Sequence, residues 1–223
     1  GSTLLNQLLS TSKNVSCNNE LGTREGQLLP EVKDIMFYNK GWHHEVYYPW
    51  EKIKKVWMKY WDQRKAILMD KSNTNIMRVG EIKKVFNNIF FLAIVRNPYA
   101  QVEGIMRRNG STIEYAAEFA LKCLRYQKEN RKNEKNILFL SYEDLCDKKD
   151  DSIKKIQEFI PELGSINADL EFSAHNFKTR GKMRIQNLND EKISKLSTEQ
   201  ISVINSFFKK EEHLLNYFGY TLI

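Results

Sequence analysis

The chain has 223 residues, 41% of them hydrophobic and 28% charged, and its formal net charge is +7. This composition is typical of one globular domain, and no apolar run approaches the length of a membrane span. The charge favours an anionic partner: a phosphate-bearing ligand, a nucleic acid or an acidic polymer. Because the lysines are spread as on ordinary solvated helix faces, we expect a local phosphate site and no nucleic acid partner.

The cysteines and histidines show no pattern of metal ligands. Cys17, Cys123 and Cys146 are widely spaced, without a CxxC pair or zinc-type spacing. His43 and His44 stand on an expected loop with no partner residues that would complete a metal site. We therefore expect buried thiols and no metal.

The first residues combine a glycine with two hydroxyl side chains. Gly1, Ser2 and Thr3 precede leucines at helical spacing, which predicts a short helix with one core face. The amino terminus of a helix binds anions through its dipole and its unpaired N–H groups. An anion site is one interpretation. A plain helix cap, like the second Gly-Ser-Thr at 110–112, and a cloning remnant are the alternatives.

A short strand at 15–17 leads into a polar, turn-rich loop over residues 18–31. The loop contains Glu20 and Glu25, and loops on a rigid scaffold commonly carry catalytic groups. Solvated glutamates are the alternative. Residues 49–61 then predict a helix whose tryptophans share one apolar face, which favours core packing over an acceptor pocket.

Strands and helices alternate from residue 66 onward. Strands are expected at 66–69, 89–95 and 137–140, and the first is followed by a helix over about 75–86. The unbroken apolar run at 89–95 is typical of a central parallel strand covered on both faces. This alternation predicts an α/β fold with a central parallel sheet flanked by helices.

Arg96 directly follows the central strand, and Asn97-Pro98 then begins a helix that ends near Gly110. Ligands of open α/β sheets bind at the carboxyl ends of the strands, and a guanidinium matches two phosphate oxygens. An arginine that merely caps the sheet or pairs with a carboxylate is the equally weighted alternative for Arg96.

The rest of the chain predicts helices and one basic loop. Residues 111–114 and 197–200 have the pattern of capping boxes, which would open a long helix to about Lys132 and a last helix with apolar residues up to Phe218. Between them lies the basic segment 178–182. It contains Arg180, Gly181 and Lys182 and would wrap a phosphate or form an ordinary surface loop.

The ordered segments GSTLLNQLL, NNELGTREGQ, ILMDKSN, IVRNPYAQVEG and LSYEDL, with a last helix ending in FGY, resemble the sulfotransferase family that uses 3′-phosphoadenosine 5′-phosphosulfate (PAPS). The resemblance implies a three-layer, P-loop-like α/β fold. It implies one domain over residues 1–223, lacking the family's first strand and the start of its phosphosulfate loop. A truncated or decayed member of the family would resemble it equally.

The resemblance also implies the residues that bind PAPS. Residues 1–3 match the end of the loop that holds the 5′-phosphosulfate. Arg96 matches the arginine that binds the 3′-phosphate, but Gly104 stands where the family has a serine. Residues 180–182 resemble the late basic loop over the same phosphate.

For the chemistry, the resemblance implies Glu25 as the general base, with Glu20 in reserve, and Lys71 as a ligand of the sulfuryl group or the acceptor. Asn73 stands where proline is usual in the family. The implied reaction moves a sulfuryl group from PAPS to the hydroxyl of a saccharide, a tyrosine or a small molecule, without a metal.

Two other functions compete with this one. A P-loop nucleotide kinase would need GxxxxGK[ST], and Gly1 stands where its lysine should precede Ser2. A non-catalytic basic module for acidic glycans or nucleic acid would need a continuous basic stripe and strongly salt-dependent binding. The expected compartment is the cytoplasm of a bacterium, or the Golgi lumen for a eukaryotic fragment, with the cytoplasm favoured. The oligomeric state is open.

Overall fold

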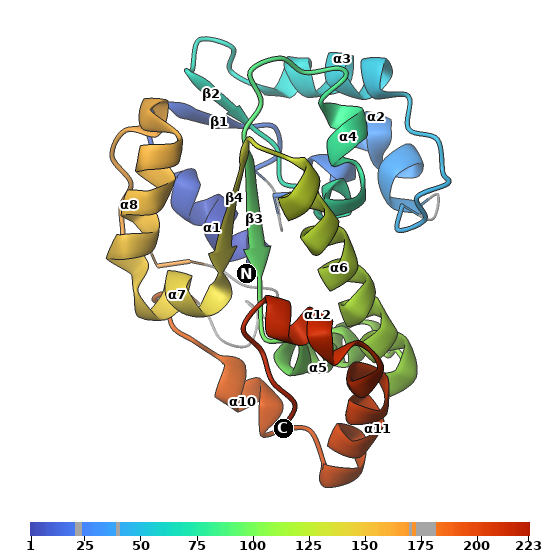
Figure 1. Cartoon of the computed structure of the whole chain (residues 1–223). Helices are drawn as coiled ribbons and strands as arrows, with labels where there is room; N and C mark the ends of the chain where they lie inside the picture. The colour runs from blue at the N-terminus through green and yellow to red at the C-terminus, as the bar shows by residue number, and fades with distance from the viewer. Residues whose placement is uncertain (21–23, 39–40, 170, 173–181) are drawn as a thin grey trace. The chain divides into compact units, whose positions relative to one another are not determined.

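The computed structural model of the chain describes residues 1–20, 24–38, 41–169, 171–172 and 182–223 (Figure 1). The chain divides into two compact units. The first comprises Gly1–Phe91 and Lys149–Ile185, and the second comprises Leu92–Lys148 and Gln186–Ile223. Among the described helices, none is long and apolar enough to cross a membrane.

The first unit combines short helices with two strands. Its elements are α1 (Ser2–Leu9), β1 (Val15–Cys17), η1 (Gly26–Leu28), α2 (Pro30–Lys33), η2 (Asp34–Tyr38), α3 (Trp50–Tyr60), β2 (Ile67–Met69), η3 (Asn73–Met77), α4 (Val79–Ile82), α8 (Lys149–Phe159) and η4 (Pro161–Leu163). The strand β1 runs parallel to β2, with Val15 opposite Ile67 and Cys17 opposite Met69.

The second unit is mostly helical. After β3 (Phe91–Val95), which begins at the boundary, come α5 (Pro98–Asn109), α6 (Ile113–Asn133), β4 (Ile137–Ser141), α7 (Tyr142–Asp147), α10 (Asn189–Ile193), α11 (Thr198–Phe208), η5 (Lys209–Glu211) and α12 (Glu212–Tyr217). The strands β3 and β4 pair, and Figure 1 draws both arrows in the same direction.

The four described strands lie where the sequence predicts them, but they form two two-stranded ladders. The structure is therefore a mixed helix and strand fold with short parallel sheets, in which the described strands pair two by two. The strand β3 begins two residues later than predicted. Only Ala93 and Val95 are fully buried in it, so the expected cover on both faces is incomplete.

The tryptophans of α3 belong to the core of the first unit. Trp50, Trp57 and Trp61 are at most 8% exposed, and successive rings meet edge to face. The ring of Phe86 stacks on Trp57 with a centroid distance of 6.0 Å. The prediction of core packing for these residues is confirmed.

The predicted continuous helix over 75–86 is wrong, because the chain forms η3 and then α4 around Arg78. This residue has φ −117° and ψ 6°, which are not helical angles. Its guanidinium is almost fully buried and donates to the carbonyl oxygens of His43 and His44, at 2.7 and 2.9 Å. These contacts with a distant loop stabilise a local break that helical periodicity does not reveal.

The helix ends of the second unit follow capping rules with one correction. Asn97 caps α5, Pro98 is its first residue, and Gly110 ends it in the left-handed conformation, as predicted. The capping box at 111–114 is wrong by one residue, because Thr112 is the cap of α6 and accepts from the N–H of Tyr115. The box at the start of α11 is confirmed, but the predicted last helix is interrupted by η5.

In the first unit, Asp70 joins the loops that follow β1 and β2. Its buried carboxylate accepts from Asn18 at 2.9 Å, Ser72 at 3.2 Å and Asn75 at 2.8 Å. Burial raises the pKa of the Asp70 carboxyl, and these hydrogen bonds oppose the rise. A Cβ atom on Gly26 would lie 2.0 Å from Asp70 Oδ1, so only glycine fits beside this network.

We expect Gly26→Ala to lower the free energy of unfolding by about 1–3 kcal/mol, because the added methyl group overpacks this network. Gly80→Ala is the matched control, since a Cβ on the exposed Gly80 of α4 meets nothing within 4 Å. That control should gain about 0.5–1 kcal/mol from helix propensity. Urea unfolding measures both, and equal midpoints for Gly26→Ala and wild type would contradict the role of the close approach.

Candidate functional site

The amino terminus of α1 begins the candidate site of the first unit. Gly1 is the N-cap and has no side chain to bond the first N–H groups of the helix. The Ser2 hydroxyl donates to Asn73 Oδ1 at 3.0 Å. A helix start with hydroxyl groups and uncapped donors suits an anion, and anion binding at this place stays a prediction.

A buried ion pair lies beside this helix start. Lys71 Nζ is 2.6 Å from Glu25 Oε1 and 3.5 Å from the hydroxyl of Thr3. The side chains of Lys71 and Glu25 are only 9% and 7% exposed. Three segments far apart in the sequence therefore bring the predicted residues Ser2, Thr3, Glu25 and Lys71 together in one place.

The carboxylate of Glu25 is held by two amides as well as by Lys71. Gln27 Nε2 donates to Glu25 Oε2, and Asn73 Nδ2 lies 3.4 Å from Oε1. Asn73 thus links Glu25 to Ser2 at the helix start. Proline, which the sequence resemblance implies at this position, could not make these hydrogen bonds, because its side chain has no donor or acceptor.

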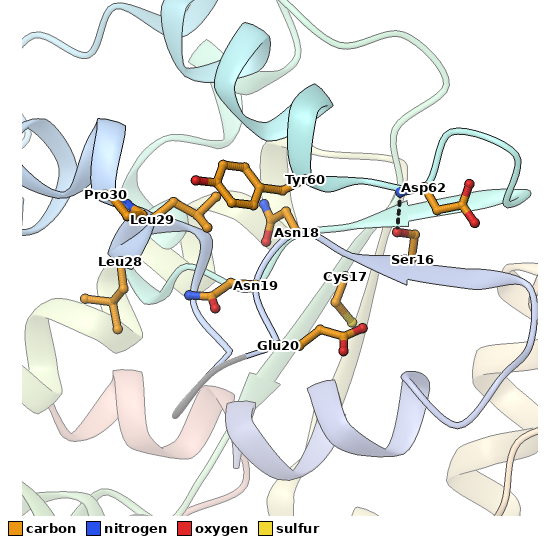
Figure 2. Close-up of a pocket in the computed structure, with 10 residues that line it drawn as sticks. All are labelled: Ser16, Cys17, Asn18, Asn19, Glu20, Leu28, Leu29, Pro30, Tyr60 and Asp62. Atoms are coloured by element: carbon orange, nitrogen blue, oxygen red, sulfur yellow. Dashed lines mark hydrogen bonds between the residues drawn. The ribbon is translucent and has the colours of Figure 1, made fainter.

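Glu20, the reserve candidate for the base, has different surroundings. It lines a cavity of about 680 Å³ in the first unit (Figure 2). The described residues around the cavity are Ser16, Cys17, Asn18, Asn19, Glu20, Leu28, Leu29, Pro30, Tyr60 and Asp62. Glu25 is not among them. The two candidate bases therefore have different surroundings: Glu25 belongs to a buried ion pair, and Glu20 lines a cavity.

In the second unit, Arg96 is oriented by a hydrogen bond and a ring. Its Nε donates to Asn189 Oδ1 at 2.8 Å, and its guanidinium lies 4.1 Å from the ring centroid of Tyr142. Burial raises the pKa of Tyr142 to about 12, so at neutral pH the ring stays a neutral phenol. The buried Nη2 atom of Arg96 has no hydrogen-bond partner among the described residues.

Asn189 is itself held by Glu143, at the start of α7. Glu143 Oε1 accepts from the N–H of Asn97 at 2.8 Å and from Asn189 Nδ2 at 2.5 Å. Glu143 Oε2 accepts from the hydroxyl of Tyr220 at 3.0 Å. The carboxylate therefore orients the amide that orients Arg96, and within the described part of the chain no ion pair joins Arg96 directly to a carboxylate.

Sequence reasoning missed Asn189, Glu143 and Tyr220 as partners of this arginine. The signal for Glu143 was present, because LSYEDL places it just after a strand, at the edge where Arg96 also lies. Nothing in the sequence around Asn189 indicated its role.

The remaining residues predicted to contact the nucleotide are Gly104 and residues 180–182. Gly104 is buried on α5, and a Cβ there would lie 3.8 Å from Arg108 Nη1, which is ordinary contact distance. Arg180 and Gly181 lie outside the described residues. Lys182 is described and exposed. The contact of this basic loop with a phosphate stays a prediction.

The structure also describes the three cysteines and the residue types that could bind a metal ion. All three cysteines are free; Cys17 is buried, and Cys123 and Cys146 are partly buried. Burial raises the pKa of Cys123 to about 12 and that of Cys146 to about 11, so both are thiols at neutral pH. No group of three or more possible metal ligands occurs in the part of the chain that the structure describes.

Comparison with known proteins assigns the family. The model of the sulfotransferase family matches residues 1–162. The chain belongs to the sulfotransferase family. The matched part of this sulfotransferase contains Ser2, Glu25, Lys71 and Arg96, and ends before Asn189. No curated protein and no solved structure matches the chain.

The buried ion pair of this sulfotransferase predicts strong coupling in a double-mutant cycle. Glu25→Gln and Lys71→Met should each lower the free energy of unfolding by about 3 kcal/mol, because each leaves a buried charge without its partner. The double variant should cost at least about 1 kcal/mol less than the sum, measured by urea unfolding.

A control cycle on the more exposed pair Lys195–Glu191, whose charged atoms are 2.7 Å apart at the end of α10, should give a coupling of only about 0.3–0.5 kcal/mol. Additivity within about 0.5 kcal/mol at Lys71 and Glu25 would show that the buried pair is not formed in solution.

Proposed function

We propose that this sulfotransferase moves a sulfuryl group from PAPS to an acceptor hydroxyl, giving 3′,5′-adenosine bisphosphate and a sulfate ester. The observation that carries the proposal is the buried Lys71–Glu25 pair beside Thr3 at the start of α1. A cation, a carboxylate and a helix amino terminus are the groups needed to bind a sulfuryl donor and to remove a proton from an acceptor.

PAPS has two anionic ends, and we assign one group of residues to each. The first group belongs to the first unit and the second group to the second unit. Ser2, Thr3 and the first N–H groups of α1 would bind the 5′-phosphosulfate. Arg96 would bind the 3′-phosphate, because its oriented guanidinium keeps a buried Nη2 donor without a partner among the described residues. Gly104 supplies no hydroxyl there, and we assign the late basic residues 180–182 to the same phosphate by resemblance.

In the transfer step, the acceptor oxygen forms a bond to sulfur while the bond from sulfur to the 5′-phosphate oxygen breaks. Glu25 would take the proton of the acceptor hydroxyl. Lys71 and the helix terminus would bind the negative charge that grows on the leaving phosphate. As in phosphoryl transfer, the protein contributes mainly position and charge.

This mechanism requires Lys71 to change partner. In the structure, Lys71 occupies the oxygen of Glu25 that would otherwise accept a proton. The incoming phosphosulfate offers more negative charge to Lys71 than one carboxylate does. Glu25 then keeps Gln27 and Asn73 as donors, and the Oε1 lone pair that had bonded Lys71 can accept the proton of the acceptor hydroxyl.

The larger fold is part of the same proposal. We infer that the described strands belong to a three-layer, P-loop-like fold with a central parallel sheet, as one domain over residues 1–223. The short parallel ladders and the family match support it.

We expect Glu25→Gln to lower turnover by roughly 100- to 10,000-fold and to leave nucleotide binding intact, because the amide cannot accept the proton. The measurement is transfer of radiolabelled sulfate from PAPS to a mixture of a saccharide, a tyrosyl peptide and a phenol. Glu158→Gln, an exposed change on α8, is the matched control and should keep wild-type turnover. Unchanged turnover in Glu25→Gln, with loss in Glu20→Gln, would reassign the base to Glu20.

A further inference from the structure

The cavity of the first unit lies where the chain leaves β1. Figure 2 shows it bounded by the residues that follow the strand, by Leu28 to Pro30, and by Tyr60 at the end of α3. Its volume of about 680 Å³ is within the usual range of small-molecule sites, roughly 300–1,000 Å³.

One wall of the cavity is apolar. Leu29 and Pro30 lie beside the ring of Tyr60, and Leu28 also lines the cavity. Tyr60 is held in place because its hydroxyl donates to Glu31 at 2.7 Å. This wall suits the aliphatic or aromatic body of a ligand.

The polar groups of the cavity are largely occupied by protein partners. Asn18 donates to Asp70, and the Ser16 hydroxyl accepts from the N–H of Asp62 at 2.8 Å. The Asp62 carboxylate accepts three hydrogen bonds from Arg64, two from its side chain and one from its backbone N–H, and they lower the pKa of Asp62 to about 2. An oxygen lone pair of Ser16, the Nδ2 group of Asn18 and the carboxylate of Asp62 are therefore already engaged within the protein.

Glu20 differs from these groups. Its exposed carboxylate has no hydrogen bond or ion pair with any described residue. Around the cavity, none of the described lining residues carries a positive charge, although the net charge of the chain is +7. Nearby cations include Arg64, which is held by Asp62, Lys65, whose field also acts on Asp62, and Arg24, whose field acts on the Cys17 thiol.

The cavity is connected to the proposed base through the backbone. Asn19, one of the lining residues, donates from Nδ2 to the carbonyl oxygen of Glu25 at 2.7 Å. Glu25 is also the residue that precedes η1, which contributes Leu28 to the apolar wall. A ligand in the cavity would therefore bind against the segment that carries Glu25.

We propose that this cavity binds the acceptor, and that the acceptor is a hydroxyl compound with an apolar body and a positively charged amine. The amine binds Glu20, and the body packs on the apolar wall. A polyanionic acceptor is disfavoured, because it would meet an unpaired carboxylate and no cation among the lining residues. The assignment of an acceptor rests on the proposed function; the binding preference itself does not.

Three phenols of matched shape test the charge preference: tyramine, para-ethylphenol and para-hydroxyphenylpropionate, which are cationic, neutral and anionic. Their dissociation constants are measured by ligand-observed NMR titration of the full chain without nucleotide. We expect tyramine to bind about tenfold more tightly than para-ethylphenol, and the anion to bind most weakly. Glu20→Gln should remove the preference for tyramine, and Glu158→Gln, the matched control, should keep it.

Equal binding of the three phenols, no binding of any, or an unchanged preference in Glu20→Gln would overturn the proposal. Binding of 3′,5′-adenosine bisphosphate is measured on the same samples. Bisphosphate binding without a tyramine preference would contradict the acceptor class and leave the proposed function standing. A tyramine preference without bisphosphate binding would contradict the proposed function and leave the amine site standing.

Discussion

The site of the first unit depends on the ion pair between Lys71 and Glu25. Removing either charge from water costs several kcal/mol, so each needs the other, and Glu25 needs its two amide donors as well. This requirement fixes the loop after β1 against the segment after β2. The Asp70 network strengthens the same junction, and Gly26 is the residue small enough to let the two segments meet.

The sequence predicted the parts of the site better than their connections. The strands at β1 and β2 and the helix of leucines were each evident from local patterns, so Ser2, Thr3, Glu25 and Lys71 could be placed at strand and helix ends. The pairing of Glu25 with Lys71 joins residues 46 apart, and no local pattern specifies such a contact. The break at Arg78 was missed for the same reason, since its partners are two carbonyl groups on a distant loop.

In the second unit, too, the sequence predicted a site residue but not its partners. Arg96 was predictable because it directly follows an apolar strand. Its partner Asn189 is 93 residues away, and the carboxylate that holds Asn189 comes from a third segment. The sequence left open whether Arg96 binds an anion or pairs with a carboxylate. The structure gives it an amide and an aromatic ring as partners, which orient the guanidinium without neutralising it.

The proposed donor carries a 3′-phosphate, and recognition of this phosphate is tested most directly by thermal unfolding with 3′,5′-adenosine bisphosphate and with 5′-AMP at equal concentration. At about 100 times its dissociation constant, the bisphosphate should stabilise the protein by about 2.7 kcal/mol, and 5′-AMP should stabilise it far less. In Arg96→Ala the difference between the two nucleotides should disappear. Equal stabilisation of the wild type by both nucleotides, or by neither, would contradict the account.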